Sequence, residues 1–153
     1  QKPIYYENKK ISYFNIEKPI SLVIAHSGIK SSTKQVVESV YQNYQKQPEK
    51  YEKIFQKVSV LTHKAKGFLE KGDVEEIGKL MLENHELLCR IGVSCFELDR
   101  LVDCAKQAGA LGAKLVGAGQ GGNIIAMVND NQKDKVISAL KKYSKCVFLI
   151  DVV

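Results

Sequence analysis

Four of the six residues from Gly117 to Gly122 are glycine, and this segment is the clearest candidate for chemistry in the chain. A short apolar run precedes it, and another, Ile124–Val128, follows it with the composition of a strand. A backbone without Cβ atoms can turn tightly and bring its amide groups close to a ligand. A hairpin loop that binds nothing is the alternative, because a short glycine-rich motif has low specificity by itself.

A second candidate group is the polar segment Ser32, Thr33 and Lys34, which precedes an apolar pattern of helical period. Ser32 and Gln35 have the spacing of a capping box, so we expect a helix from this point to about Gln45. Its predicted inward-facing stripe comprises Val36, Val37, Val40, Tyr41 and Tyr44.

The remaining pattern predicts an α+β domain. Helix boundaries are indicated by Pro48 and Gly72, by Asp73 with Glu76 and Gly92, by Ser94 with Glu97 and Gly109, and by Asn131 or Asp130. Strands are predicted at Ile11–Asn15, Ser21–His26 and Cys146–Val152, besides the two runs that flank the glycines. This order fits a ferredoxin-like antiparallel sheet with helices on one face and an added helical cluster.

The chain has 153 residues, which is one domain's length, and a formal net charge of +6. The lysines are spread along amphipathic helices, so solvated helix faces explain most of them and steering of an anionic ligand is a secondary reading. Nucleic-acid binding is disfavoured because no aromatic residues alternate with a basic run. We expect a cytoplasmic location, since no apolar run has membrane-spanning length and the start does not resemble a signal peptide.

The cysteines are interpreted as structural thiols in a reducing compartment. Cys89, Cys95, Cys104 and Cys146 form no C-x-x-C pair, and no histidine is predicted at ligand spacing, so no metal site is expected. His85 is interpreted as a packed, hydrogen-bonded side chain rather than a ligand.

Three blocks together resemble the C-terminal half of small-molecule kinases of the galactokinase, homoserine kinase and mevalonate kinase superfamily. They are Val23–Lys34, Asn84–Asp99 and Gly112–Gly122. The second block, in this order between the other two, makes the mevalonate kinases the most similar branch. The resemblance extends from about Pro3 to Val153.

The resemblance implies transfer of the γ-phosphate of ATP, with Mg²⁺, to the primary hydroxyl of mevalonate. It places six loop residues near the phosphates: Gly117, Ala118, Gly119, Gln120, Gly121 and Gly122. It places Ser32 and Thr33 near the acceptor or the phosphoryl group, Lys34 where it offsets negative charge, and Ser94 in the acceptor pocket. For Ser32 and Ser94, helix capping is the competing role, and for Lys34 it is simple solvation.

The sequence departs from the family pattern at Gln120, Asn123 and His26, and this leaves the acceptor open to phosphomevalonate, homoserine or a sugar. The phosphate loop and the catalytic aspartate of the family are not found, so we expect residues 1–153 to be a C-terminal domain that needs an N-terminal half for activity. ATP and Mg²⁺ would be bound mainly by that half. A non-catalytic ligand-binding module is the alternative, and a homodimer of the full-length protein is left open.

Overall fold

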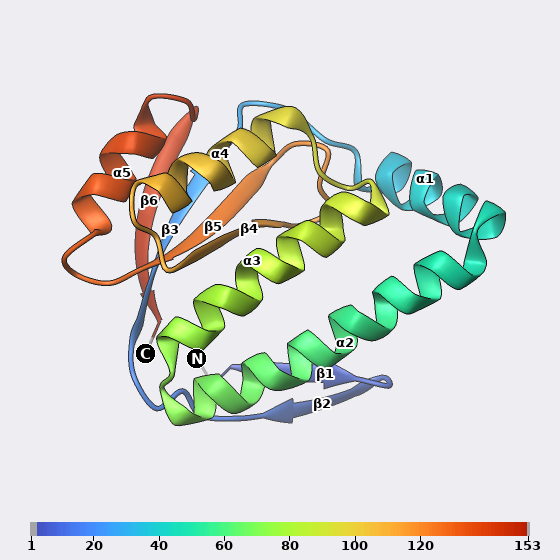
Figure 1. Cartoon of the computed structure of the whole chain (residues 1–153), viewed down its shortest axis with the longest axis horizontal. Helices are drawn as coiled ribbons and strands as arrows, with labels where there is room; N and C mark the ends of the chain where they lie inside the picture. The colour runs from blue at the N-terminus through green and yellow to red at the C-terminus, as the bar shows by residue number, and fades with distance from the viewer. Residues whose placement is uncertain (1–2, 153) are drawn as a thin grey trace.

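A computed structural model describes residues 3–152 and contains a four-stranded antiparallel sheet (Figure 1). Its strands are β3 (Ile20–His26), β4 (Gly112–Val116), β5 (Asn123–Val128) and β6 (Cys146–Val152), in the order β4-β5-β3-β6. Helices connect β3 to β4 and β5 to β6, and β4 and β5 form a hairpin. This is the βαββαβ order of a ferredoxin-like layer, so the predicted fold class is confirmed.

Five helices complete this layer: α1 (Thr33–Lys46), α2 (Pro48–Lys71), α3 (Val74–Ile91), α4 (Phe96–Gln107) and α5 (Lys133–Lys141). Two predicted caps are confirmed, because Ser32 Oγ accepts from Gln35 N at 3.5 Å and Asp73 Oδ1 accepts from Glu76 N at 3.2 Å. Each bond satisfies an amide group that has no partner inside its helix. Within residues 3–152, every helix is too short or too polar to cross a membrane.

Two other predicted caps are wrong. Helix α4 begins one residue later than predicted, with Cys95 at the N-cap position, and the hydroxyl of Ser94 has a different partner. Helix α5 is preceded by Gln132, whose side chain makes no capping bond, rather than by Asn131 or Asp130. A turn over residues 130–132 separates those two residues from the helix.

The helices cover more than one face of the sheet, which differs from the prediction. Helices α4 and α5 pack on one face, and the main core there includes Val23, Ala25, Ala113, Leu115, Ile124, Leu98, Leu101, Val136 and Leu140. A second cluster joins Ile20 and Met127, on the opposite face, to Ile77 and Met81 of α3. The α2–α3 hairpin therefore wraps around the β4 edge.

Helix α1 projects away from the sheet beside α2 (Figure 1), and most of its predicted apolar stripe is not buried. Val36 is buried, but Val37 and Tyr41 are 60% and 55% exposed. The prediction for these two residues is wrong because α1 has one neighbouring helix rather than a sheet to cover.

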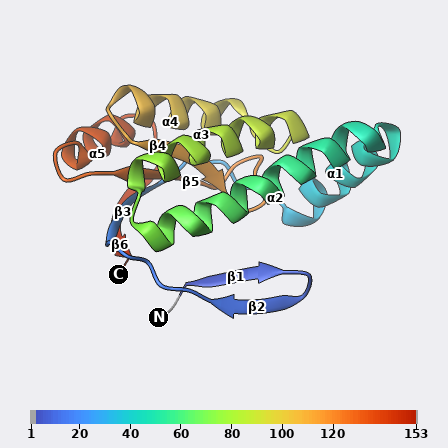
Figure 2. The same cartoon turned by 60° about the horizontal axis from the view of Figure 1, so that its bottom comes forward.

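A separate two-stranded sheet, β1 (Ile4–Glu7) and β2 (Lys10–Tyr13), lies beside α2 (Figure 2). The sequence predicted one strand here, with its bounds shifted to Ile11–Asn15. The hairpin turn has positive φ at Asn8 (49°) and Lys9 (63°), as a type I′ turn requires. One face packs on α2, and the other exposes Ile4, Tyr6, Ile11 and Tyr13.

Helix α3 and strand β4 approach each other at backbone distance. A Cβ atom at Gly112 would overlap the carbonyl oxygen of Gly78, and one at Gly78 would overlap the carbonyl of Leu111. This contact brings the α2–α3 hairpin against the sheet edge and sets the position of the strand that leads into the glycine-rich loop.

We expect Gly112→Ala to lower the free energy of unfolding by about 1–3 kcal/mol, because the added methyl group must displace the α3 backbone. Gly67→Ala in α2 is the matched control, since a Cβ there meets nothing within 4 Å. It should leave stability unchanged or raise it by up to about 1 kcal/mol. Urea denaturation of the two variants measures both effects, and equal stabilities would contradict the close approach.

Candidate functional site

The glycine-rich loop Gly117–Gly122 joins β4 to β5 and is held from two sides by backbone hydrogen bonds. Gln120 N donates to Val93 O at 2.8 Å, on the turn between α3 and α4. Gly122 N donates to Ile29 O at 3.0 Å, on the connection between β3 and α1. The loop therefore lies between two segments that are far apart in the sequence.

Two of the glycines are required by this packing. A Cβ atom at Gly119 (φ 90°) would overlap the carbonyl oxygen of Val93, and one at Gly121 (φ 131°) would press on the carbonyl of Ile29. Both residues also have a backbone conformation that glycine adopts much more readily than other residues. Ser31 Oγ donates to Gly119 O and adds a side-chain contact from the β3–α1 connection.

The loop and the start of α1 line adjoining cavities. A cavity of about 430 Å³ is lined by His26, Ile29, Lys30, Ser31, Thr33, Val116, Gly117, Ala118, Gly119, Gly121, Gly122 and Asn123. A second, of about 260 Å³, is lined by Lys30, Ser31, Ser32, Gln35, Val36, Ser39, Gly92 and Gln120. The two predicted segments are thus brought together, and Lys30 and Ser31 belong to both cavities. Lys34 and Ser94 line neither.

Several backbone donors of the loop have no acceptor in the described part of the chain. Among residues 3–152, the amides of Gly117, Ala118, Gly119 and Gly121 make no hydrogen bond, whereas those of Gln120 and Gly122 are used to anchor the loop. Helix α1 directs its N-terminus at the same region and has no acidic residue in its first turn. Free amides and a helix N-terminus together favour a bound anion.

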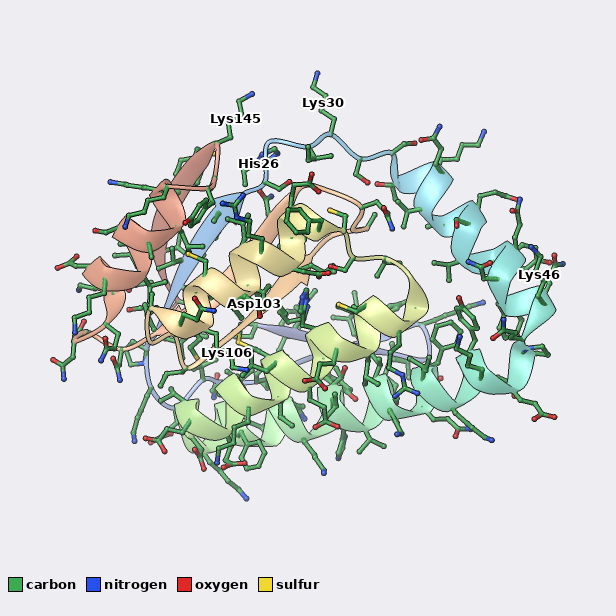
Figure 3. All side chains as sticks on the ribbon, turned by 45° about the horizontal axis from the view of Figure 1, so that its top comes forward. His26, Lys30, Lys46, Asp103, Lys106 and Lys145 are labelled. Carbon is green, nitrogen blue, oxygen red and sulfur yellow. The ribbon has the colours of Figure 1, made fainter. Side chains whose placement is uncertain are left out.

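His26 and Lys30 line the larger cavity, and Lys145 lies next to His26 in the sequence-distant connection before β6. Figure 3 shows His26, Lys30 and Lys145 gathered where β3 leads into α1, with both lysines directed away from the ribbon. Two bonds fix this corner: His26 Nδ1 accepts from Gly28 N, and Lys145 N donates to His26 O, each at 2.8 Å. The positive charge would attract an anionic ligand before it reaches the loop.

The residues lining the two cavities do not fit a magnesium site. Neither lining contains an aspartate or a glutamate, and Mg²⁺ is usually held by carboxylate oxygens together with phosphates. The site as described offers donors and positive charge, but no hard anionic ligand for a metal.

The side chain of Gln120 ties the loop to the α3–α4 turn. Its Nε2 atom donates to Gly92 O at 2.7 Å and to Ser94 O at 2.9 Å. The residue adopts φ 55°, in the left-handed region. The departure from glycine at this position therefore adds two hydrogen bonds that hold the loop.

A partly buried network connects the strand before the loop to both neighbouring helices. His85 Nδ1 accepts from Leu115 N at 3.3 Å, and His85 Nε2 lies 3.2 Å from Asp99 Oδ1. Asp99 also accepts from the Ser94 hydroxyl and from the Cys89 thiol. The packed interpretation of His85 is confirmed. The role of Asp99 was missed, although the His85–Cys89 spacing of four on one helix could have indicated the cluster.

The absence of a histidine at ligand spacing from a cysteine was a wrong expectation, since Cys89 Sγ lies 3.7 Å from His85 Nε2. The geometry nevertheless suits hydrogen bonding rather than a metal ion. A metal ion on Nε2 would leave the proton on Nδ1, where it would face the Leu115 N–H, a second donor. Metal-ligating histidines instead donate their other ring N–H to an acceptor. Burial also raises the pKa of the Cys89 thiol.

Acidification should destabilise the fold through His85. Burial lowers the pKa of His85 below its ordinary value of 6.5, although Asp99 partly opposes this. The unfolded chain therefore binds this proton more readily than the folded chain does. The contribution of His85 to the free energy of unfolding is present above about pH 6.5 and is lost as the pH falls below that value. We expect His85→Gln to reduce this slope in urea denaturation between about pH 7 and 5. His63→Gln, on exposed α2 surface, should keep it, and an unchanged slope in His85→Gln would contradict the assignment.

Comparisons with known proteins find mevalonate kinases similar to this chain in sequence and in fold. The mevalonate kinase of Pyrococcus abyssi is 39% identical over 144 residues, which are 90% of this chain and 42% of the relative. The structure of L. major mevalonate kinase in complex with R-mevalonate has a TM-score of 0.90 at 32% identity, covering 97% of this chain and 48% of that one. The Methanococcus jannaschii mevalonate kinase has a TM-score of 0.77 at 28% identity. The chain spans less than half the length of these relatives.

The family model described as GHMP kinases C terminal matches residues 65–146, more than half of the chain. The match includes α3, α4 and the glycine-rich loop, whereas the β3–α1 connection and α1 lie outside it. The chain belongs to the GHMP kinase C-terminal family.

Proposed function

We propose that this chain is the C-terminal domain of an ATP-dependent kinase that phosphorylates mevalonate to 5-phosphomevalonate, in the cytoplasm. The single observation that carries the proposal is one cavity lined both by four loop residues whose amides make no hydrogen bond among residues 3–152 and by Thr33 at the start of α1. The similarity to mevalonate kinases over 90% of the chain supports the choice of acceptor.

Phosphoryl transfer needs alignment of two anionic reactants and donors directed at the charge on the moving group. In the proposed arrangement, Gly117, Ala118, Gly119 and Gly121 present N–H groups to the phosphates of ATP. Because their backbone is already packed, these donors need no reorganisation during the reaction.

The start of α1 is proposed to position the acceptor or the phosphoryl group. Thr33 lines the larger cavity and Ser32 the smaller one. The hydroxyl of Ser32 already accepts a capping bond, and a hydroxyl can donate one further bond at the same time. Lys34, the residue after Thr33, is proposed to offset the negative charge of the acceptor or the phosphoryl group. Ser94 is proposed to act on the site through Asp99 and Gln120, the residues that it contacts.

The catalytic carboxylate and the magnesium ligands are assigned to an N-terminal half, since no carboxylate lines either cavity. Magnesium, when bound, neutralises phosphate charge. We therefore expect residues 1–153 alone to show no turnover of ATP with mevalonate.

A chimera tests the proposal. Residues 1–153 would replace the matching C-terminal segment of the Pyrococcus abyssi mevalonate kinase, and ATP-dependent phosphorylation would be assayed with mevalonate, phosphomevalonate, homoserine and galactose. We expect activity with mevalonate and none from the isolated chain. Full turnover by the isolated chain, or a folded chimera that prefers another acceptor, would contradict the proposal.

In an active chimera, Gly119→Ala should lower kcat/KM by at least about 100-fold, because a displacement of the loop by about 1 Å misaligns the reacting groups. Lys106→Ala, on the surface of α4, is the control and should leave activity unchanged. Circular dichroism and thermal denaturation check that the Gly119→Ala protein is folded. Unchanged phosphoryl transfer in that folded protein would instead favour a ligand-binding module whose loop does not face a nucleotide.

A further inference from the structure

A small cavity between α2, α3 and β4 contains one charged side chain, Lys114. Its volume is about 210 Å³, and it shares no lining residue with the cavities at the glycine-rich loop. The rest of its lining is mostly apolar and comprises Leu61, Thr62, Ala65, Ile77, Leu80, Met81 and Asn84.

The ammonium group of Lys114 has no acidic partner among residues 3–152. The ion pairs within this range involve other lysines or His85, and Lys114 Nζ donates only to the carbonyl oxygen of Leu115, at 2.9 Å. Burial lowers the pKa of Lys114. The titratable group that senses its charge is His85, and no acid or base other than Lys114 lines the cavity. Lys114 is partly buried, and a cation withdrawn from water without a counter-charge is unfavourable, so a bound anion would stabilise it.

The surroundings of Lys114 define the chemistry of that anion. The ammonium group has three donors and uses one, which leaves two for a ligand. Asn84 and Thr62 add polar groups, and the four largest apolar side chains form the walls. The combination of an apolar pocket, a few convergent polar groups and one shifted titratable group is typical of a small-molecule site.

We propose that this cavity binds a short aliphatic carboxylate, with its carboxylate on Lys114 Nζ and its chain against Leu61, Leu80 and Met81. The volume equals that of about seven water molecules at about 30 Å³ each, which limits the ligand to a comparable number of heavy atoms. The site lies outside the proposed phosphoryl-transfer site and does not depend on that function.

Pentanoate is a suitable probe, and pentanamide is its neutral counterpart of the same size. Titration of the 153-residue chain, followed by NMR, should give a dissociation constant of about 1 mM for pentanoate, a reasonable affinity for a ligand of about seven heavy atoms. Pentanamide should bind at least tenfold more weakly. Equal binding of the two compounds would overturn the proposal.

Lys114→Met removes the charge and keeps a side chain of similar length, and it should weaken pentanoate binding at least tenfold. The matched control is Lys64→Met, at an exposed position of α2, which should bind as the unmodified chain does. Lys114→Met should also raise the melting temperature in the absence of ligand, because it removes an uncompensated charge from a partly buried position. Undiminished binding by a folded Lys114→Met chain would exclude the site.

A measurement on the unsubstituted chain avoids any dependence on folding of the variant. After reductive ¹³C-methylation of the lysines, the Lys114 resonance should titrate at lower pH than those of exposed lysines, and saturating pentanoate should move its midpoint upward. A midpoint that does not move with pentanoate would rule out contact between the carboxylate and Lys114.

Discussion

The candidate site depends on the packing of bare backbone against bare backbone. At Gly119 the loop lies so close to the α3–α4 turn that a single methyl group would overlap the Val93 carbonyl, and at Gly121 it lies almost as close to Ile29. These contacts place the loop between two segments that the chain order separates widely. Because protein interiors are close-packed, a loop held in this way has one position rather than a range of them. Its remaining amides can then be directed at a ligand without further ordering.

The turn that receives the loop is itself held by polar groups. The Gln120 side chain donates to the Gly92 and Ser94 carbonyls. Asp99 accepts from the Ser94 hydroxyl and contacts the imidazole of His85. His85 in turn accepts the Leu115 amide on β4, so the network returns to the strand from which the loop starts. A partly buried network of this kind is most stabilising when all of its members are satisfied. No buried side-chain nitrogen or oxygen among residues 3–152 lacks a partner. His85 must be neutral to accept the Leu115 N–H at Nδ1. Protonation of His85 would therefore break this bond.

Local patterns predicted the parts of the fold that depend on neighbours in the sequence. The order of elements along the chain, the five helices and the caps at Ser32 and Asp73 follow from strand composition, helical period and capping spacing. The failures involve distant partners. Ser94 has capping spacing, but its hydroxyl binds Asp99 instead, and Val37 remains exposed because α1 has little to cover.

The site shows the same division between local and distant information. Glycine content indicated the loop, and a capped helix start indicated Ser32 and Thr33, since both depend on short segments. Lys30 and Ser31 line the same two cavities because the β3–α1 connection passes beside the loop. No local residue pattern predicts that contact. Lys114 is a similar case. On β4 it reads as one polar residue in an apolar strand, and only the α2–α3 hairpin passing around the β4 edge encloses it. The backbone contact between Gly78 and Gly112 therefore brings α3 against the strand that leads to the loop. It also places α3, which supplies Ile77, Leu80, Met81 and Asn84 to the lysine cavity, beside Lys114 on β4. A shift of α3 relative to β4 would therefore change both the glycine-rich loop and the lysine cavity.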